Sequence, residues 1–169
     1  MFTVLFAQPY DISAQGFCFR NADEYKQRSS VAVNAHGQPV GEFEIQFIDG
    51  EHIDSALAEA ISLNQSNCLA FFDLCDELDK HEKLTLIIAV GECGYDYQPG
   101  QTRADDFDIE IYAVNSMREL AEQFVDDGLL GDTPESLLHY FNYDAFARDL
   151  AIEYSEIEIA NQRYMYRCS

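Results

Sequence analysis

The chain has 169 residues, enough for one ordinary domain or for two or three very small ones, and its formal net charge is −21 at pH 7. The chain has 31 Asp and Glu but only ten Lys and Arg, and this excess of negative charge excludes nucleic-acid binding through phosphate contacts. Twelve Phe and ten Tyr exclude a disordered acidic segment, because such segments are poor in aromatic residues. No apolar run is long enough to span a membrane and residues 1–10 resemble a first strand, so we expect a cytoplasmic protein without a membrane partner.

The first fifty residues indicate short strands. In residues 42–48, Phe43, Ile45 and Phe47 alternate with polar residues, which is the period of a half-buried strand. Further strands are predicted at residues 3–6 and 16–19, and a helix is predicted at residues 23–30.

From residue 51 onward the apolar residues recur at helical spacing. Ile53, Leu57 and Ile61 share one face of a first helix. A second helix has an apolar face made of Phe71, Leu74, Cys75 and Leu78. Its opposite face carries Asp73, Asp76, Glu77 and Lys80. Residues 84–90 are continuously apolar and fit either a buried helix or a buried strand, and residues 91–101 are the best candidate for a linker.

The last third of the chain contains both segments with the alternation of a strand and segments with the spacing of a helix. Residues 106–112 predict a strand whose outward side chains, Asp106, Asp108 and Glu110, point to solvent. Ser116 and Glu119 have the spacing of a capping box, and the helix that they begin ends at Gly128. Two further helices are predicted to start at Thr133-Pro134 and at Asn142, followed by strands at residues 155–159 and 163–167.

This order of elements predicts an α+β fold, an elongated chain of small subdomains with short antiparallel sheets and helices. We expect an N-terminal β-rich subdomain over residues 1–62 and a helical middle subdomain over residues 63–104. The C-terminal α+β subdomain would then cover residues 105–169.

The carboxylates raise two functional hypotheses. The segment 105–110 has oxygen ligands suitable for Mg²⁺ or Ca²⁺, but no EF-hand or HExxH spacing occurs, and no phosphate-binding or nucleophile motif is present. We therefore expect no enzyme, no cofactor and no metal site. An acidic metal-binding or metal-dependent protein remains one alternative. The other is a decoy that offers carboxylates in place of phosphates to a cationic DNA-binding protein.

Residues 115–150 contain a recognisable pattern. An acidic helix and a glycine turn are followed by particular residue types at set spacings. These residues are Pro134, Ser136, Leu137, Tyr140, Tyr143, Ala145, Arg148, Asp149 and Leu150. In this pattern the chain resembles the ArdA antirestriction proteins, from which it departs at Thr133 and Asn142. The resemblance covers about residues 106–169.

The resemblance implies an elongated, curved protein of three small domains that forms a homodimer through its C-terminal part. Such a dimer occupies the DNA-binding groove of type I restriction–modification enzymes. It protects incoming mobile DNA without catalysis and without binding nucleic acid itself.

The family's antirestriction motif falls on residues 119–132. We expect the target-binding acidic surface to comprise Asp73, Asp76, Glu77, Asp106, Asp108, Glu110, Glu119, Glu122, Asp126, Asp127 and Asp132. The residues expected in the core or the dimer interface are Tyr140, Tyr143, Phe146 and Leu150. Arg148 and Asp149 are expected to form a buried pair within the subdomain.

Overall fold

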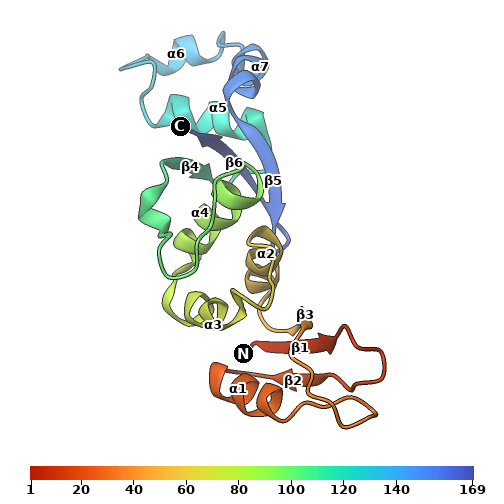
Figure 1. Cartoon of the computed structure of the whole chain (residues 1–169). Coiled ribbons are helices and arrows are strands. Elements are labelled where there is room, and N and C mark those ends of the chain that lie inside the picture. The colour runs from red at the N-terminus through yellow and green to blue at the C-terminus, as the bar shows by residue number, and fades with distance from the viewer. The chain divides into compact units, whose positions relative to one another are not determined.

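The computed structural model describes residues 1–169 and contains seven α-helices, one short 3-10 helix and six strands (Figure 1). The chain divides into two compact units, Met1–Phe107 and Asp108–Ser169. Each unit holds one three-stranded antiparallel sheet together with helices, so the predicted α+β class is confirmed. The further division of the first unit at residue 62 stays a prediction.

The sheet of the first unit has the strand order β2-β1-β3 and is antiparallel throughout. Its elements are β1 (Val4–Pro9), β2 (Phe17–Phe19), α1 (Ala22–Ser30) and β3 (Phe43–Asp49). In β3 the predicted alternation is confirmed, since Phe43 and Ile45 are buried and Phe47 is half-buried. The Phe19 ring contacts the rings of Tyr25 on α1 and Phe72 on α3 (Cys68–Glu77), at centroid distances of 4.9 and 5.8 Å. Aromatic packing thus joins the sheet to α1, which lies between two of its strands in sequence, and to α3, which follows its last strand.

The continuous apolar run at residues 84–90 lies in a helix, α4 (Lys80–Gly91). Asp79 and Glu82 begin this helix with a complete capping box, in which the Asp79 side chain accepts from the Glu82 N–H and the Glu82 side chain accepts from the Asp79 N–H. A helix in this position is buried nearly all round, which explains why its sequence has no polar stripe. Lys80 begins α4, so its predicted place on the preceding helix is wrong.

A buried ion pair joins α4 to α2 (His52–Ala60). The Lys83 Nζ lies 2.7 Å from the Asp54 carboxylate, and both side chains are less than a tenth exposed. The same ammonium donates to the Cys75 carbonyl oxygen on α3 at 2.8 Å. One cation therefore holds three helices of the first unit together at a dry position.

The second unit is built around a sheet with the strand order β4-β6-β5. Its elements are β4 (Ile109–Tyr112), α5 (Met117–Asp126), α6 (Glu135–Leu138), α7 (Tyr143–Glu153), β5 (Ser155–Ile159) and β6 (Gln162–Cys168). Ala160 and Asn161, with φ angles of 52° and 63°, form the two-residue turn between β5 and β6, where tight hairpins favour positive φ at both positions. The core packs α5 against α7 through Leu120, Ala121 and Leu150.

Three predicted details of this region are wrong. The strand expected at residues 106–112 begins only at Ile109, because Asp106 lies in the 3-10 helix η1 (Ala104–Asp106) and accepts from the Arg103 N–H at 2.8 Å. Pro134, rather than Thr133, occupies the cap position of α6, and no side chain caps this helix. Arg148 and Asp149 are both exposed and form no buried pair.

Candidate functional site

Acidic side chains dominate the surface of the second unit. This unit contains thirteen Asp and Glu against four Arg. Eleven of the thirteen acids are exposed, and the other two, Glu110 and Glu122, are half-buried. None is withdrawn into the core, so nearly the whole negative charge of this unit is presented to solvent.

Helix α5 supplies the rigid support for the acids at residues 119–132. The Ser116 hydroxyl oxygen accepts from the Glu119 N–H at 3.1 Å and caps the helix. The predicted capping box is not completed, because the Glu119 side chain accepts from the Asn115 N–H at 2.8 Å and not from the Ser116 N–H. Gly128 ends it with a φ of +90°, a conformation that glycine adopts without strain. Between these ends Leu120 and Val125 are buried, so the opposite face, which carries Glu122 and Asp126, is fixed by core packing.

The C-terminal end of α5 has the wrong charge for helix stability. Asp126 and Asp127 occupy its last residue and its cap, and its last turn contains no basic residue. Negative charge at this end opposes the helix dipole, at a cost of about 0.3–1 kcal/mol per charge near a surface. Stability of the helix therefore does not account for these two acids, which makes them candidates for a binding role.

Three of the four Arg of the second unit are engaged with acids of the same unit. Arg118 lies 3.0 Å from Glu122 and 2.7 Å from Asp144, and Arg163 lies 3.1 Å from Glu156. Arg167 pairs with Glu110 and Glu153. Arg148 alone forms no ion pair. Eight of the thirteen acids have no Lys or Arg partner: Asp108, Glu119, Asp126, Asp127, Asp132, Glu135, Asp149 and Glu158.

Glu110 is the exception among the predicted surface acids. It does not point freely to solvent, since its side chain is 31% exposed and accepts from the Tyr154 hydroxyl at 2.6 Å. The hydrogen bond from Tyr154 lowers the pKa of the Glu110 carboxyl most, and the Arg167 guanidinium lowers it further. Burial, and after it the hydrogen bond to this carboxylate, raises the pKa of Tyr154. Glu110 therefore anchors the sheet to the end of α7 and is less available to a partner than its neighbours.

The first unit holds the remaining predicted acids. Asp73, Asp76 and Glu77 are exposed on α3, and Asp106 is exposed in η1. Asp73 and Glu77 line a hollow of about 500 Å³, together with Glu82 and Asp105. The structure thus brings α3 and the segment before Asp106 together around one hollow, where these four acids lie beside the basic Arg103, an arrangement that the sequence did not indicate.

The four residues expected in the core or in a dimer interface differ in exposure. Leu150 is buried in the core of the second unit, and Tyr143 and Phe146 pack partly against it. Tyr140 is 87% exposed. It lies at the end of a segment with three more exposed apolar residues, Leu129, Leu130 and Leu137.

The chain offers no obvious centre for chemistry. No group of three or more His, Cys, Asp or Glu side chains is placed to hold a metal ion. Burial raises the pKa of the Cys68 thiol to about 11 and that of Cys75 to about 12, so both thiols are protonated at neutral pH. None of the helices combines the length and the apolar composition needed to cross a membrane.

Sequence reasoning did not find the groups that organise these acids. Arg118 bridges two helices of the second unit, and Tyr154 fixes Glu110 across 44 residues of chain. Arg118 and Glu122 have the i,i+4 spacing of a helical ion pair, which is a local signal. The contacts of Arg118 with Asp144 and of Tyr154 with Glu110 had none, because these partners come close only in the folded chain. For the buried pair of the first unit a signal existed, since Lys83 directly precedes the apolar run of α4.

Comparison with protein families gives one match. The model of the antirestriction protein family ArdA matches residues 18–165, which is most of the chain. None of the curated proteins matches the chain.

Proposed function

Since the chain belongs to the ArdA family of antirestriction proteins, we propose that it inhibits type I restriction–modification enzymes by occupying their DNA-binding groove. The observation that supports this mechanism most is the set of eight acids in the second unit that are exposed and have no basic partner. A protein that needed only solubility would intersperse both signs of charge on its surface. In the second unit only four Arg accompany thirteen acids, and two of them, Arg118 and Arg167, each lie between two acids.

The amount of charge suits a mimic of duplex DNA. B-form DNA carries one negative charge per about 1.7 Å of axis, so a charge of −21 equals that of roughly 36 Å of duplex. A homodimer would match roughly 70 Å, or about 21 base pairs. This is a length that an enzyme reading a divided recognition sequence has to hold in its groove.

The mechanism is electrostatic. Lys and Arg that line the groove of the enzyme pair with carboxylates in place of phosphates, and opposite charge accelerates the encounter. Each exposed pair contributes little, because solvent and salt screen it, so the affinity arises from many pairs together. No bond is made or broken in the process, and the chain acts in the cytoplasm without cofactor or direct contact with nucleic acid.

The residues that we propose to meet the enzyme are the exposed acids of both units. In the second unit these are Asp108, Glu119, Glu122, Asp126, Asp127 and Asp132, with Glu110 in a supporting position. In the first unit they are Asp73, Asp76, Glu77 and Asp106. Asp126 and Asp127 have the strongest individual case, because they stand where they weaken their own helix.

We also propose that the chain is a homodimer and that the exposed apolar segment of the second unit forms its interface. Leu129, Leu130, Leu137 and Tyr140 are each between 46% and 87% exposed. Four large apolar side chains are thus exposed within twelve residues of the chain, and exposed apolar surface of this kind usually marks a protein–protein contact. Tyr residues are enriched at the centres of such contacts, so Tyr140 is the anchor we expect.

The experiment is a titration of plasmid cleavage by a purified type I restriction enzyme, with DNA binding by that enzyme followed in parallel. The test variant replaces Asp108, Asp126, Asp127 and Asp132 by Asn. The matched control replaces the same four residues by Glu, which changes the side chains and keeps the charge. We expect the wild type and the Glu control to block cleavage and DNA binding near stoichiometry, and the Asn variant to be far weaker.

Salt provides the second arm of this experiment. Between about 50 and 200 mM salt, inhibition by the wild type should weaken steeply, as expected for an interface of many charge pairs. Inhibition that stays constant over this range, or that the Asn variant retains in full, would contradict the mimicry mechanism.

A further inference from the structure

Strand β3 has an open edge in the sheet of the first unit. The strand order β2-β1-β3 leaves β3 paired with β1 on one side only. Its remaining edge is a row of backbone N–H and C=O groups that an added strand could pair with. Such an edge is either protected by the protein or used for binding.

The Gln65 side chain shows which backbone groups face outward. Its Oε1 accepts from the Phe43 N–H at 3.0 Å, and its Nε2 donates to the Gly41 carbonyl oxygen at 2.6 Å. Outward and inward residues alternate along a strand, so Ile45 and Phe47 also direct their N–H and C=O groups away from β1. No protein group pairs with the outward N–H groups of these two residues. Gln65 therefore covers the beginning of the edge and leaves the rest open.

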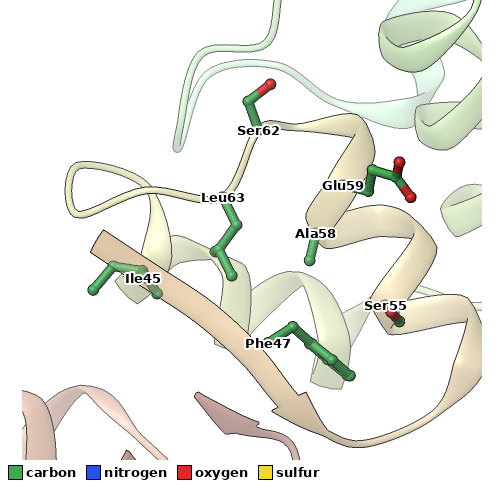
Figure 2. A pocket seen from close by; sticks show the side chains of 7 residues that line it. All are labelled: Ile45, Phe47, Ser55, Ala58, Glu59, Ser62 and Leu63. Carbon is green, nitrogen blue, oxygen red and sulfur yellow. The ribbon is translucent and has the colours of Figure 1, made fainter. Parts of the chain in front are cut away.

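A groove runs beside this open part of β3. It has a volume of about 360 Å³ and is lined by Ile45 and Phe47 on one side and by Ser55, Ala58, Glu59, Ser62 and Leu63 on the other (Figure 2). Figure 2 shows the Ala58 and Leu63 side chains directed towards the strand, whereas the Ser62 hydroxyl points away from it. The groove is thus bounded on one side by the strand edge and on the other by α2 and the turn that follows it. Domains that bind an extended peptide as an extra strand have the same two walls.

We propose that this groove binds an extended segment of a basic protein, which adds to β3 as a further antiparallel or parallel strand. The backbone of the segment would pair with Ile45 and Phe47. This inference goes beyond the proposed inhibition mechanism, because it requires main-chain pairing at a defined edge and does not depend on DNA mimicry.

The side chains around the edge define the chemistry of the segment. Those on the face of Ile45 and Phe47 would lie beneath Ala58 and Leu63, so they should be small or apolar. Those on the other face would stand beside Glu44, which is exposed, and opposite charges on neighbouring strands attract. No Lys, Arg or His lines the groove, and Glu59 adds a carboxylate to its wall. A segment that alternates apolar with Lys or Arg residues therefore fits.

Charge also argues against a second copy of the chain as the occupant. Pairing of β3 with its own copy would place the exposed Glu44 of each copy at the new strand contact, where it would meet acidic and not basic neighbours. Like charges on adjacent strands destabilise the pairing.

The test uses the full chain and a short synthetic peptide that alternates Val and Lys. The first control peptide has the same composition with all Lys grouped at one end, and the second has N-methyl groups on alternate backbone nitrogens. Binding is measured at about physiological salt, where non-specific attraction is screened. Hydrogen exchange of the Ile45 and Phe47 amides reports the pairing itself.

We expect the alternating peptide to slow exchange of both amides roughly tenfold or more, as a new cross-strand hydrogen bond does. Both control peptides should leave these amides unprotected. Equal binding by the grouped peptide without protection of the two amides would show that only overall charge is recognised, and would overturn the proposal.

Two variants test whether the peptide binds in the groove. Ser55→Lys puts a bulky cation on its helical wall, and the matched control Ser30→Lys makes the same charge change at an exposed residue of α1 that does not line the groove. Both sites are exposed, so both variants should fold, which circular dichroism checks. We expect Ser55→Lys to weaken peptide binding about tenfold and Ser30→Lys to change it less than about twofold. Equal effects of the two variants would contradict the assignment of the groove.

Discussion

Lys83 of the first unit and the paired Arg residues of the second unit lie in opposite environments. In the first unit Lys83 is buried and holds three helices through Asp54 and the Cys75 carbonyl. In the second unit Arg118, Arg163 and Arg167 lie at the surface and connect acids that remain partly or largely exposed. A cation in the core serves the fold of this protein. Cations on the surface arrange the acids without neutralising the majority of them.

The largest effect is expected from Lys83→Met. The substitution leaves the Asp54 carboxylate in the core without its cation, and breaking a buried pair in this way costs about 3–5 kcal/mol of unfolding free energy. Urea denaturation followed by circular dichroism measures it. The double variant Asp54→Leu/Lys83→Met removes both charges and should recover most of the loss. If the single variant lost less than about 1 kcal/mol, the pair would not hold the helices as described.

A smaller effect is expected from Glu110→Gln in the second unit. The change removes a carboxylate that accepts from Tyr154 and pairs with Arg167, and hydrogen bonds to a charged group of this kind contribute about 1.5 kcal/mol or more. The pH dependence provides a sharper signature. Because the folded-state pKa of Glu110 is lowered, its stabilising contribution is present above the ordinary pKa of Glu and is lost as the pH falls through the lowered value.

The acid unfolding profile tests this sign. Stability of the wild type should fall more steeply than that of Glu110→Gln as the pH drops below the ordinary pKa of Glu, so the two curves converge at low pH. Tyr154→Phe keeps the ring and removes the donor, and should shift the profile in the same direction. Parallel curves for wild type and variant would contradict the network.

Arg118→Gln should have little effect on stability. Both of its ion pairs are solvent-exposed, and such pairs contribute little to stability because solvent and salt screen them. The variant lacks one positive charge, so its net charge is more negative by one unit and inhibition of the restriction enzyme should be unchanged or slightly stronger. A marked loss of inhibition at unchanged stability would assign Arg118 a direct contact with the enzyme, which a mimic of phosphate charge does not require.

The smallest effect is expected from a single surface acid. Asp108→Asn and Asp127→Asn should each change inhibition less than about threefold, because rim charges are screened and the binding energy is divided among many of them. The measurement is the concentration of each variant that gives half-maximal inhibition, compared with that of the wild type. A single Asn substitution that abolished inhibition in a folded protein would reveal a discrete site in place of a distributed one.

Local signals in the sequence were sufficient for several elements. Both ends of α5 follow from Ser116 and Gly128, and the burial of β3 follows from its alternation. The capping box of Asp79 and Glu82 would also have decided that residues 84–90 form a helix. In these cases the residues that determine the structure are neighbours in the chain.

Non-local contacts set the limit of the sequence prediction. Glu110 alternates like a solvent-facing strand residue, yet Tyr154 and Arg167 reach it from 44 and 57 residues away. Asp106 continues the same alternation, but its carboxylate is used to close a 3-10 turn. The groove beside β3 had no sequence signal at all, because it depends on how α2 lies along a strand edge.

The most direct measurement of the central claim is an equilibrium competition between this protein and a fluorescent DNA duplex for a purified type I restriction enzyme. If the chain occupies the DNA groove, the apparent dissociation constant of the duplex should rise in proportion to the protein concentration without a plateau, and the protein alone should not bind the duplex. A rise that reaches a plateau, with enzyme, duplex and protein in one complex, would show that the chain binds elsewhere on the enzyme.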